Sequence, residues 1–405
     1  MSFRLYSIIK GDTIYNHKQI KAITCKDRFI FVNAGAGSGK TTVMIERIKR
    51  LILEGVSKQD ILGLTFSKEA ATQMKERLNI ENVYISTFHS FCYQYIEGFD
   101  VIPKSVPFSK DYLLKVSLYK NKMGRKPFFY HRYISYLKKH KFIDYDDMLI
   151  GFISIKDVYQ YKHILIDEFQ DTNFLQLKVL AKLIHKKTHV FVVGDPDQSI
   201  YGFRGAMKEV SDYFIHKFNA TLITLDMNYR SDSNILSVAN KVITNNTNRI
   251  EKTLACTTEN NGMVALHIFN SIHTYLQFIY NVILSTSFNS YAIITRTNKQ
   301  LFDIKTTIDL NIPMFKIQKI SLFTLHASKG LEFDCVFILG VDNNHIPYKF
   351  SGNNFSIEEE RRLFYVGITR ARHALYFIHY KYNKNVKLSK FIDEISDNQV
   401  FKAIK

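Results

Sequence analysis

The chain has 405 residues, which exceeds the roughly 250 to 300 residues at which a single hydrophobic core stops growing, so we expect at least two domains. Hydrophobic residues make up 46% and charged residues 23%, and with only 6 prolines and 17 glycines this composition excludes a disordered or fibrous chain. The 55 Lys and Arg against 37 Asp and Glu give a net charge of +18, which favours a polyanionic partner, either nucleic acid or a membrane surface.

Cysteine usage and the lack of long apolar runs indicate where the protein works. The N-terminal residues lack the apolar core of a signal peptide, and no run approaches the ~18 apolar residues of a membrane span. We therefore expect a soluble intracellular protein, with cytoplasm and nucleus both open. No spacing typical of a disulfide framework or zinc site links the cysteines, which predicts buried thiols in a reducing compartment. They are Cys25, Cys92, Cys256 and Cys335.

Short apolar, β-branched segments alternate with helical patterns along the chain, which predicts parallel sheets covered by helices. The expected strands of the first half are residues 29–32, 61–66, 83–87, 163–167 and 190–195. Those of the second half are residues 222–225, 292–296, 322–325, 335–341 and 374–380. We expect two α/β units that join near Asn219, giving domains of residues 1–219 and 220–405.

The strand pattern disappears between Val101 and Phe142, which predicts a small helical insertion over residues 100–143. Between Val101 and Phe142, eleven Lys or Arg and the single acid Asp111 contribute +10 of the +18 net charge. Two interpretations fit it: a solvated basic face over an aromatic core, or a surface that binds nucleic acid. The aromatic residues among the charges are Tyr112, Tyr119, Phe128, Phe129, Tyr130, Tyr133 and Tyr136.

The segment AGAGSGKT follows an expected strand and opens a helical pattern, which is the setting of a phosphate-binding loop. Small residues let backbone N–H groups surround phosphates at a helix N-terminus, while Lys40 reaches the β and γ phosphates and Thr41 ligates Mg²⁺. Ala34 replaces the first glycine of the generic pattern, and a glycine-rich turn before a helix is the alternative interpretation. The expected loop residues are Ala34, Gly35, Ala36, Gly37, Ser38, Gly39, Lys40 and Thr41.

Two carboxylates follow the expected strand at residues 163–167. Ligands of open α/β sheets bind at the carboxyl ends of the strands, so Asp167 and Glu168 are expected at a ligand site rather than in an ordinary solvated turn. Asp167 can hold Mg²⁺, and Glu168 can orient and deprotonate the attacking water.

The motifs together resemble the superfamily 1 DNA helicases of the UvrD/Rep/PcrA type. They run in family order from Gln19 to Arg372 and include AGAGSGKTT, HILIDEFQDTNFLQ, VVGDPDQSIYGFRGA, LDMNYRSDSNILSVAN, TLHASKGLEF and EERRLFYVGITRARHAL. The resemblance implies an α/β fold of two RecA-like P-loop NTPase domains, called 1A and 2A, with ATP and Mg²⁺ as cofactors. It also implies an ATP-dependent enzyme that acts on DNA.

The resemblance implies a role for several residues at the nucleotide. Gln19 would read the adenine edge and Tyr229 would stack on the base, while Thr42 stands where relatives often have an arginine near the adenine. Gln198 would sense the γ-phosphate, and Glu332 would bind the ribose hydroxyls. Arg230 and Arg370 would stabilise the transferring phosphoryl group across the cleft between the domains.

The resemblance also implies a path for single-stranded DNA over both domains. Stacking surfaces would come from Phe66, Tyr201 and Phe203, each worth about 1 to 3 kcal/mol per base. Phe203 stands where relatives commonly have Trp, and the chain contains no Trp. Residues in segments that touch the DNA backbone or couple it to the ATP site are Arg204, Thr87, His89, Thr324 and His326.

The chain departs from larger relatives by a reduced 1B insertion and by no evident 2B insertion. We therefore consider three functions: an ATP-dependent helicase moving 3′ to 5′ by inchworm steps, a single-strand translocase with weak unwinding, and a non-enzymatic nucleic-acid-binding module. The expected partners are single-stranded DNA and single/double-strand junctions rather than a membrane. Repair, replication and maintenance of a viral or plasmid genome remain open as pathways.

Overall fold

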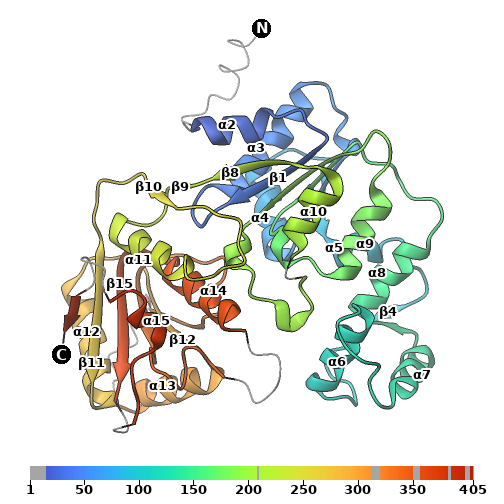
Figure 1. The fold of residues 1–405 in the computed structure, drawn as a ribbon. Coiled ribbons are helices and arrows are strands. Elements are labelled where there is room, and N and C mark those ends of the chain that lie inside the picture. The colour runs from blue at the N-terminus through green and yellow to red at the C-terminus, as the bar shows by residue number, and fades with distance from the viewer. Residues whose placement is uncertain are drawn as a thin grey trace. The chain divides into compact units, whose positions relative to one another are not determined.

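The computed structural model describes residues 15–207, 209–311, 320–349, 356–381, 385–396 and 402–404. The described chain forms two compact units (Figure 1), each containing a six-stranded sheet in which every strand pair is parallel. This confirms the predicted α/β class with parallel sheets. The first unit takes Met1–Ala34, Gly39–Pro196 and Tyr201–Leu225, and the second takes Gly35–Ser38, Asp197–Ile200 and Asp226–Lys405.

The first sheet has the strand order β3-β2-β6-β7-β1-β8. Its four central strands, β2, β6, β7 and β1, are buried on both faces, as apolar runs in parallel sheets are, whereas the edge strands β3 and β8 are partly exposed. Loops at their carboxyl ends carry most of the motif residues of this unit. The strands are β1 (Phe29–Ala34), β2 (Ile61–Thr65), β3 (Tyr84–Thr87), β6 (His163–Ile166), β7 (His189–Gly194) and β8 (Thr221–Leu225).

Helices cover both faces of the first sheet. One face packs its apolar side chains, such as Ile30 and Val32, against α2, α3 and α4. On the other face Phe31 meets Phe169, which in turn meets Phe214 of α10. The helices of this unit's main body are α2 (His17–Thr24), α3 (Lys40–Leu53), α4 (Lys68–Leu78), α5 (Phe88–Tyr93), α8 (Tyr145–Ser154), α9 (Phe174–Leu183) and α10 (Val210–Phe218).

Strand β8 corrects one expectation. Residues 222–225 were expected to open the second unit, but β8 pairs with β1, in register from Ile30 opposite Thr221 to Ala34 opposite Leu225. The first unit therefore extends to Leu225. An apolar run shows that a strand is buried but carries no information about its partner, so the sequence did not reveal to which sheet this strand belongs.

The basic stretch forms two helices, α6 (Lys110–Lys120) and α7 (Tyr130–His140). A short parallel ladder closes it, because β4 (Asp100–Val101) pairs with β5 (Phe142–Ile143). Inside it, buried Val116, Tyr133 and Leu137 form a small core of their own. Most of the aromatic residues of this stretch pack in or against that core, as the first interpretation of the sequence expected.

The second sheet has the strand order β13-β12-β14-β15-β11-β16. Strand β11 was not predicted, although its nearly continuous apolar run, MVALHIF, is typical of a strand in a parallel sheet. The strands are β11 (Met263–Phe269), β12 (Tyr291–Thr295), β13 (Ile320–Thr324), β14 (Phe333–Leu339), β15 (Ala371–Tyr380) and β16 (Lys402–Ile404). A separate short ladder joins β9 (Met227–Asn228) and β10 (Ala255–Cys256).

Helices also cover both faces of the second sheet. One face packs residues such as Phe337 and Tyr376 against α12 and α13. On the other, Phe364 of α14 meets Phe377 of β15 and Phe391 of α15. The helices are α11 (Ser233–Ile243), α12 (Ile272–Ser285), α13 (Asn298–Asn311), α14 (Ile357–Ile368) and α15 (Lys390–Asp393). Among the described residues, no helix combines the length and apolar character needed to span a bilayer.

Candidate nucleotide and nucleic-acid sites

The loop between β1 and α3 has the conformation of an anion-binding turn. Gly37 and Gly39 have φ angles of 65° and 83°, a left-handed region that residues with a Cβ rarely enter. Ser38 Oγ donates to Gly35 O at 2.8 Å, and Lys40 Nζ donates to the last carbonyl of β1 at 3.3 Å. Helix α3 begins directly after this turn, so its N-terminal N–H groups face the position that an anion would take.

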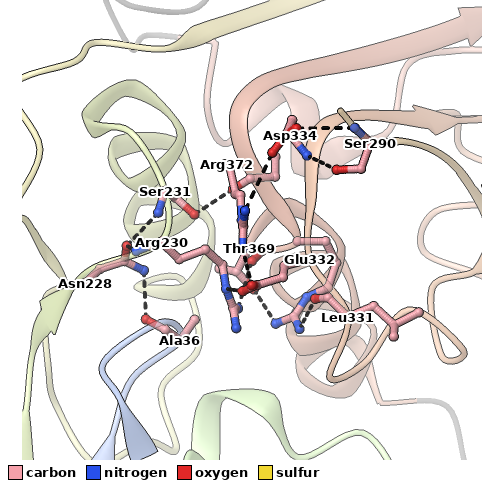
Figure 2. Close-up of polar contacts among 12 residues, drawn as sticks. Ala36, Asn228, Arg230, Ser231, Ser290, Leu331, Glu332, Asp334, Thr369 and Arg372 are labelled. Carbon is pink, nitrogen blue, oxygen red and sulfur yellow. Dashed lines mark hydrogen bonds and ion pairs between the residues drawn. The ribbon is translucent and has the colours of Figure 1, made fainter. Parts of the chain in front are cut away.

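The tip of this loop, Gly35–Ser38, groups with the second unit. There Asn228, which has no exposed surface, donates from Nδ2 to Ala36 O at 2.7 Å. Its Oδ1 accepts from the backbone N–H groups of Arg230 and Ser231, both at 2.8 Å (Figure 2). Asn228 therefore shapes the turn that carries Arg230. This role of Asn228 was not predicted, although the residue is polar and stands between Met227 and Tyr229 in LDMNYRS.

The two predicted carboxylates follow β6 directly. Asp167 Oδ1 accepts from the N–H of Glu168 at 2.9 Å, and Glu168 has a φ of 51°, an uncommon conformation for a non-glycine residue. The buried Gln170 donates to Glu168 Oε2 and accepts from the N–H of Asp195, which follows β7, at 2.9 Å. Gln170 thus links the carboxylate of Glu168 to the residue that follows β7, a role that the sequence did not indicate. Thr41, the other predicted magnesium ligand, is the second residue of α3.

Two predicted phosphate-sensing residues contact each other. Arg370 is buried just beyond α14, and its guanidinium donates to Gln198 Oε1 at 3.3 Å. The carbonyls of Val366 and Leu331 accept from the same guanidinium at 2.8 and 2.9 Å. These acceptors fix the plane of the guanidinium and hold Gln198 beside it.

The segment that contains Gln198 is anchored within the second unit by four basic residues. The buried Asp197 accepts from Arg249 through both oxygens, at 3.1 and 2.8 Å, and from Lys252 at 2.7 Å. Lys329 and Arg362 donate to the next two carbonyls of the segment at 3.0 and 2.9 Å. None of these contacts was predicted, because the anchoring residues lie between 50 and 170 positions away along the chain.

The second predicted phosphate arginine is bound to the predicted ribose carboxylate. Arg230 Nε lies 2.7 Å from Glu332 Oε2, and Arg230 Nη1 donates to Thr369 O at 3.2 Å (Figure 2). Glu332 Oε1 forms a second ion pair, with Arg372. Burial disfavours the ionised form of Glu332, but Arg230 and Arg372 outweigh it and lower the pKa of this carboxyl.

The adenine candidates of the first unit lie near the phosphate loop. Gln19 is buried in α2, and its Nε2 would lie 2.9 Å from a Cβ added to Gly39, so it packs against the loop. The hydroxyl of Thr42 accepts from Arg77 at 2.9 Å, which brings an unpredicted guanidinium to the position where relatives often have an arginine. In the second unit, Tyr229 exposes 44% of its surface, as a stacking platform would.

The predicted DNA-stacking residues of the first unit form one cluster. The rings of Phe66 and Tyr201 are stacked, 5.3 Å between centroids at 13°. Tyr201 also lies 6.3 Å from Phe203, and Arg204 sits over both of these rings at 5.4 and 5.3 Å. Phe66 and Phe203 are exposed at 40% and 46%. These four residues, the aromatic platform, combine apolar faces with a cation.

The remaining predicted DNA contacts have structural roles of their own. Thr87 is the N-cap of α5 and its hydroxyl accepts from the first turn at 3.2 Å. His89 packs edge-on against Tyr145, and burial lowers the pKa of its imidazole to about 4. Thr324 ends β13 and accepts from the N–H of the residue three further on, and His326 lies partly exposed in the following turn.

The basic residues of the insertion fall into two classes. Ten of the eleven are exposed, but the side chain of Lys120 is only 3% exposed and pairs with Asp144 at 2.6 Å and Asp147 at 2.7 Å. The hydroxyl of Tyr133 also donates to Asp144, at 2.6 Å. Lys120 therefore belongs to a buried polar cluster at the base of the insertion. It has to be removed from the candidate nucleic-acid surface, and so does the buried Tyr133.

The C-terminal end of α6 in the insertion lies beside the aromatic platform. A Cβ added to Gly205, next to the platform, would lie 3.7 Å from Leu118 Cδ2 and 3.8 Å from Met123 Sδ of the insertion. In the segment between α6 and α7, Phe128 and Phe129 expose 84% and 50% of their surfaces, and their rings pack edge to face with centroids 5.0 Å apart. Exposed cations and exposed rings therefore extend from the platform onto the insertion.

Comparison with known protein families gives two matches that together cover most of the chain. A model of the UvrD-like helicase C-terminal domain matches residues 223–323 and 311–382. A model of an AAA domain matches residues 18–204, the part of the chain that contains the phosphate loop and both carboxylates.

Curated relatives are helicases by name. The chain is 29% identical to a "Probable DNA helicase" of Mycoplasma pneumoniae, over 90% of this chain and 83% of that protein. It is 30% identical to "ATP-dependent DNA helicase Rep" of Buchnera aphidicola, over 82% of this chain and 59% of that protein. It is 31% identical to "ATP-dependent DNA helicase PcrA" of Bacillus subtilis, over 59% of this chain and 40% of that protein. The chain thus spans about half the length of the larger relatives.

Proposed function

Because the chain belongs to the superfamily 1 DNA helicases of the UvrD/Rep/PcrA type, and its two units are RecA-like domains, we propose that it is an ATP-dependent DNA helicase. In this proposal it translocates on single-stranded DNA from 3′ to 5′. The observation that carries the proposal is the preformed phosphate loop at the N-terminus of α3, with Lys40 at its end and two carboxylates after β6.

In the proposed reaction the first unit binds the phosphates and prepares water for attack. The loop N–H groups and Lys40 hold the β and γ phosphates. Glu168, oriented by Gln170, positions the attacking water and accepts its proton. Thr41 and Asp167 are the oxygen ligands that would hold Mg²⁺, which prefers one or two such groups together with substrate phosphates. When bound, this ion neutralises charge on the phosphate oxygens.

The second unit supplies guanidinium groups in the proposed reaction. Arg230 and Arg370 stabilise the charge that spreads over the transferring phosphoryl oxygens. Gln198 responds to the γ-phosphate, and its contact with Arg370 supports a shared role. Only two residues separate Gln198 from Tyr201 of the aromatic platform. In this proposal, a movement of Gln198 is passed along this short backbone segment to Tyr201.

The aromatic platform and the exposed cations of the insertion form the proposed DNA surface. Each base stacked on the platform contributes about 1 to 3 kcal/mol, and this stacking tolerates any sequence. The ten exposed cations of the insertion neutralise phosphates without reading bases. Thr87, His89, Thr324 and His326 stay proposals as DNA contacts, with Thr87 acting through the helix that it caps.

A second candidate function is translocation on single strands with weak unwinding. The segment between β12 and β13, where larger relatives carry the 2B insertion, comprises only residues 296–319, and α13 takes up most of it. A short connection of this kind leaves the motor without the element that regulates unwinding in the larger relatives.

Strand displacement tests both functions. A helicase should release the labelled strand from a 3′-tailed duplex when ATP is supplied, and a 5′-tailed duplex should remain intact. ATP hydrolysis and streptavidin removal from 3′-biotinylated or 5′-biotinylated single strands, without duplex release, would support the translocase. Release of the 5′-tailed duplex alone would overturn the proposed polarity.

A further inference from the structure

Glu332 lies between two guanidinium groups that differ in how firmly they are held. Its Oε2 pairs with Arg230 Nε at 2.7 Å, and its Oε1 pairs with Arg372 (Figure 2). Arg372 also lies 3.7 Å from Asp334 Oδ1, so the charges alternate along Arg230, Glu332, Arg372 and Asp334. All four residues belong to the second unit.

The Arg372 end of this row is fixed by the backbone. Asp334 Oδ2 accepts from the N–H groups of Asn289 and Ser290 at 2.8 and 3.2 Å. The N–H of Asp334 in turn donates to the hydroxyl of Ser290 at 2.9 Å. With three such bonds, Asp334 cannot move without disrupting the end of β14. The carboxylate that faces Arg372 is therefore a rigid anchor.

A β-bulge aims Arg372 at this anchor. Phe333 pairs with Ala371 and Cys335 pairs with Ala374, so two residues of β15 stand opposite the single residue 334 of β14. An extra residue in one strand re-aims side chains and is frequent beside active sites. Here the extra residue lets β15 present Arg372 next to Glu332, two residues after Arg370, which immediately precedes the strand.

The Arg230 end is held differently. Apart from Glu332, its guanidinium donates to Thr369 O at 3.2 Å, and its backbone is set by Asn228. If Arg230 turns to a phosphate, Glu332 loses one of its two ion pairs. A carboxylate that is left unpaired in a half-buried position relaxes or takes up a proton, whereas one still paired on its other side keeps its charge and place.

We propose that Arg372 is a positioning residue that keeps Glu332 in place while Arg230 leaves it for the nucleotide phosphates. The inference rests on the proposed function, because it takes Glu332 as the ribose-binding carboxylate. In the nucleotide-free chain, Glu332 holds both arginines. With nucleotide bound, Glu332 keeps Arg372, and the oxygen that Arg230 has left accepts hydrogen bonds from the ribose hydroxyls.

Equilibrium binding of two nucleotides tests this proposal. Calorimetric titration of the full chain with ATP and with 2′,3′-dideoxy-ATP, which lacks both ribose hydroxyls, measures the contribution of those hydroxyls. Hydrogen bonds to a charged acceptor predict that the wild type prefers ATP by about tenfold or more. Arg372→Gln should reduce this preference to about twofold, mainly through weaker ATP binding, and Arg372→Lys should keep an intermediate preference.

Two further results distinguish the inference from its premise. His373→Gln, one position along β15, removes a ring that contacts Asp232 at 3.0 Å instead of Glu332, and it should keep the wild-type preference. If Arg372→Gln also keeps the wild-type preference, Arg372 does not position Glu332 and the inference is overturned while the proposed function stands. If the wild type does not bind ATP, the proposed function fails and the inference fails with it.

Discussion

The buried Lys120 and the exposed lysines of the same insertion should respond in opposite ways to substitution. Lys120→Met leaves Asp144 and Asp147 without their cation, and breaking a buried ion pair costs about 3 to 5 kcal/mol. Because Asp147 is partly exposed, we expect the lower end of that range, about 3 kcal/mol of unfolding free energy. Lys138→Gln with Lys139→Gln, at exposed positions, should change stability by less than about 0.5 kcal/mol.

DNA binding should show the reverse pattern. Each phosphate contact on single strands contributes about 0.7 to the slope of log affinity against log salt, so the double variant should lose about 1.4. When the salt concentration is raised from about 50 to about 200 mM, the double variant should therefore lose about sevenfold less affinity for DNA than the wild type loses. Lys120→Met, measured under conditions in which the variant is folded, should keep the wild-type slope. Fluorescence anisotropy of a labelled single strand and urea denaturation provide the two readouts.

The pH dependence provides a second check on the Lys120 cluster. Burial, and then the neighbouring Asp144, raise the pKa of Asp147 to about 6. A carboxyl whose folded pKa lies above its unfolded value takes up a proton on folding, so its destabilising contribution shrinks as the pH falls toward the unfolded pKa. The cost of Lys120→Met should therefore be about 1 kcal/mol smaller near pH 5.5 than near pH 7.5. If Lys120→Met instead flattened the salt dependence of DNA binding and left stability unchanged, Lys120 would contact DNA and would not belong to the buried cluster.

Three further predictions concern other parts of the chain. Burial lowers the pKa of His89 to about 4, so the stability that its neutral form contributes is lost as the pH falls from about 6.5 to about 4. The wild type should therefore lose unfolding free energy between about pH 7.5 and about pH 5.5, and His89→Gln should make this loss smaller by about 1 kcal/mol in urea denaturation. Asp197→Asn leaves the buried Lys252 without its carboxylate and should destabilise the chain by about 3 kcal/mol, and an unchanged midpoint would contradict the anchoring role. Phe203→Ala should weaken single-strand binding by about 1 to 3 kcal/mol and Phe203→Trp should strengthen it, whereas equal affinities for both would remove Phe203 from the platform.

Local patterns predicted the first unit's phosphate loop and the two carboxylates after β6. The loop is local because small residues, positive φ angles and the start of α3 all fall within eight residues, Ala34 to Thr41. The order of apolar runs also gave the fold class. By contrast, residues 222–225 were assigned to the wrong sheet, since strand pairing is a long-range property.

Residues that act through distant partners could not be found by the same reasoning. Lys120 is one of eleven similar cations in sequence, and only the fold buries it beside Asp144 and Asp147. Arg372 is an ordinary basic residue in TRAR until the bulge of β15 brings it to Glu332. Such side chains are defined by three-dimensional contacts, so their sequence context carries little information about them.

We propose that this chain hydrolyses ATP faster when single-stranded DNA is bound to it. The most direct test is the steady-state rate of phosphate release with and without a single strand, for the wild type, Lys40→Ala and Glu168→Gln. We predict a clear stimulation by DNA in the wild type and its loss in both variants, since one removes the phosphate-binding ammonium and the other the base. Turnover that ignores DNA, or that persists near the wild-type rate in either variant, would contradict the account.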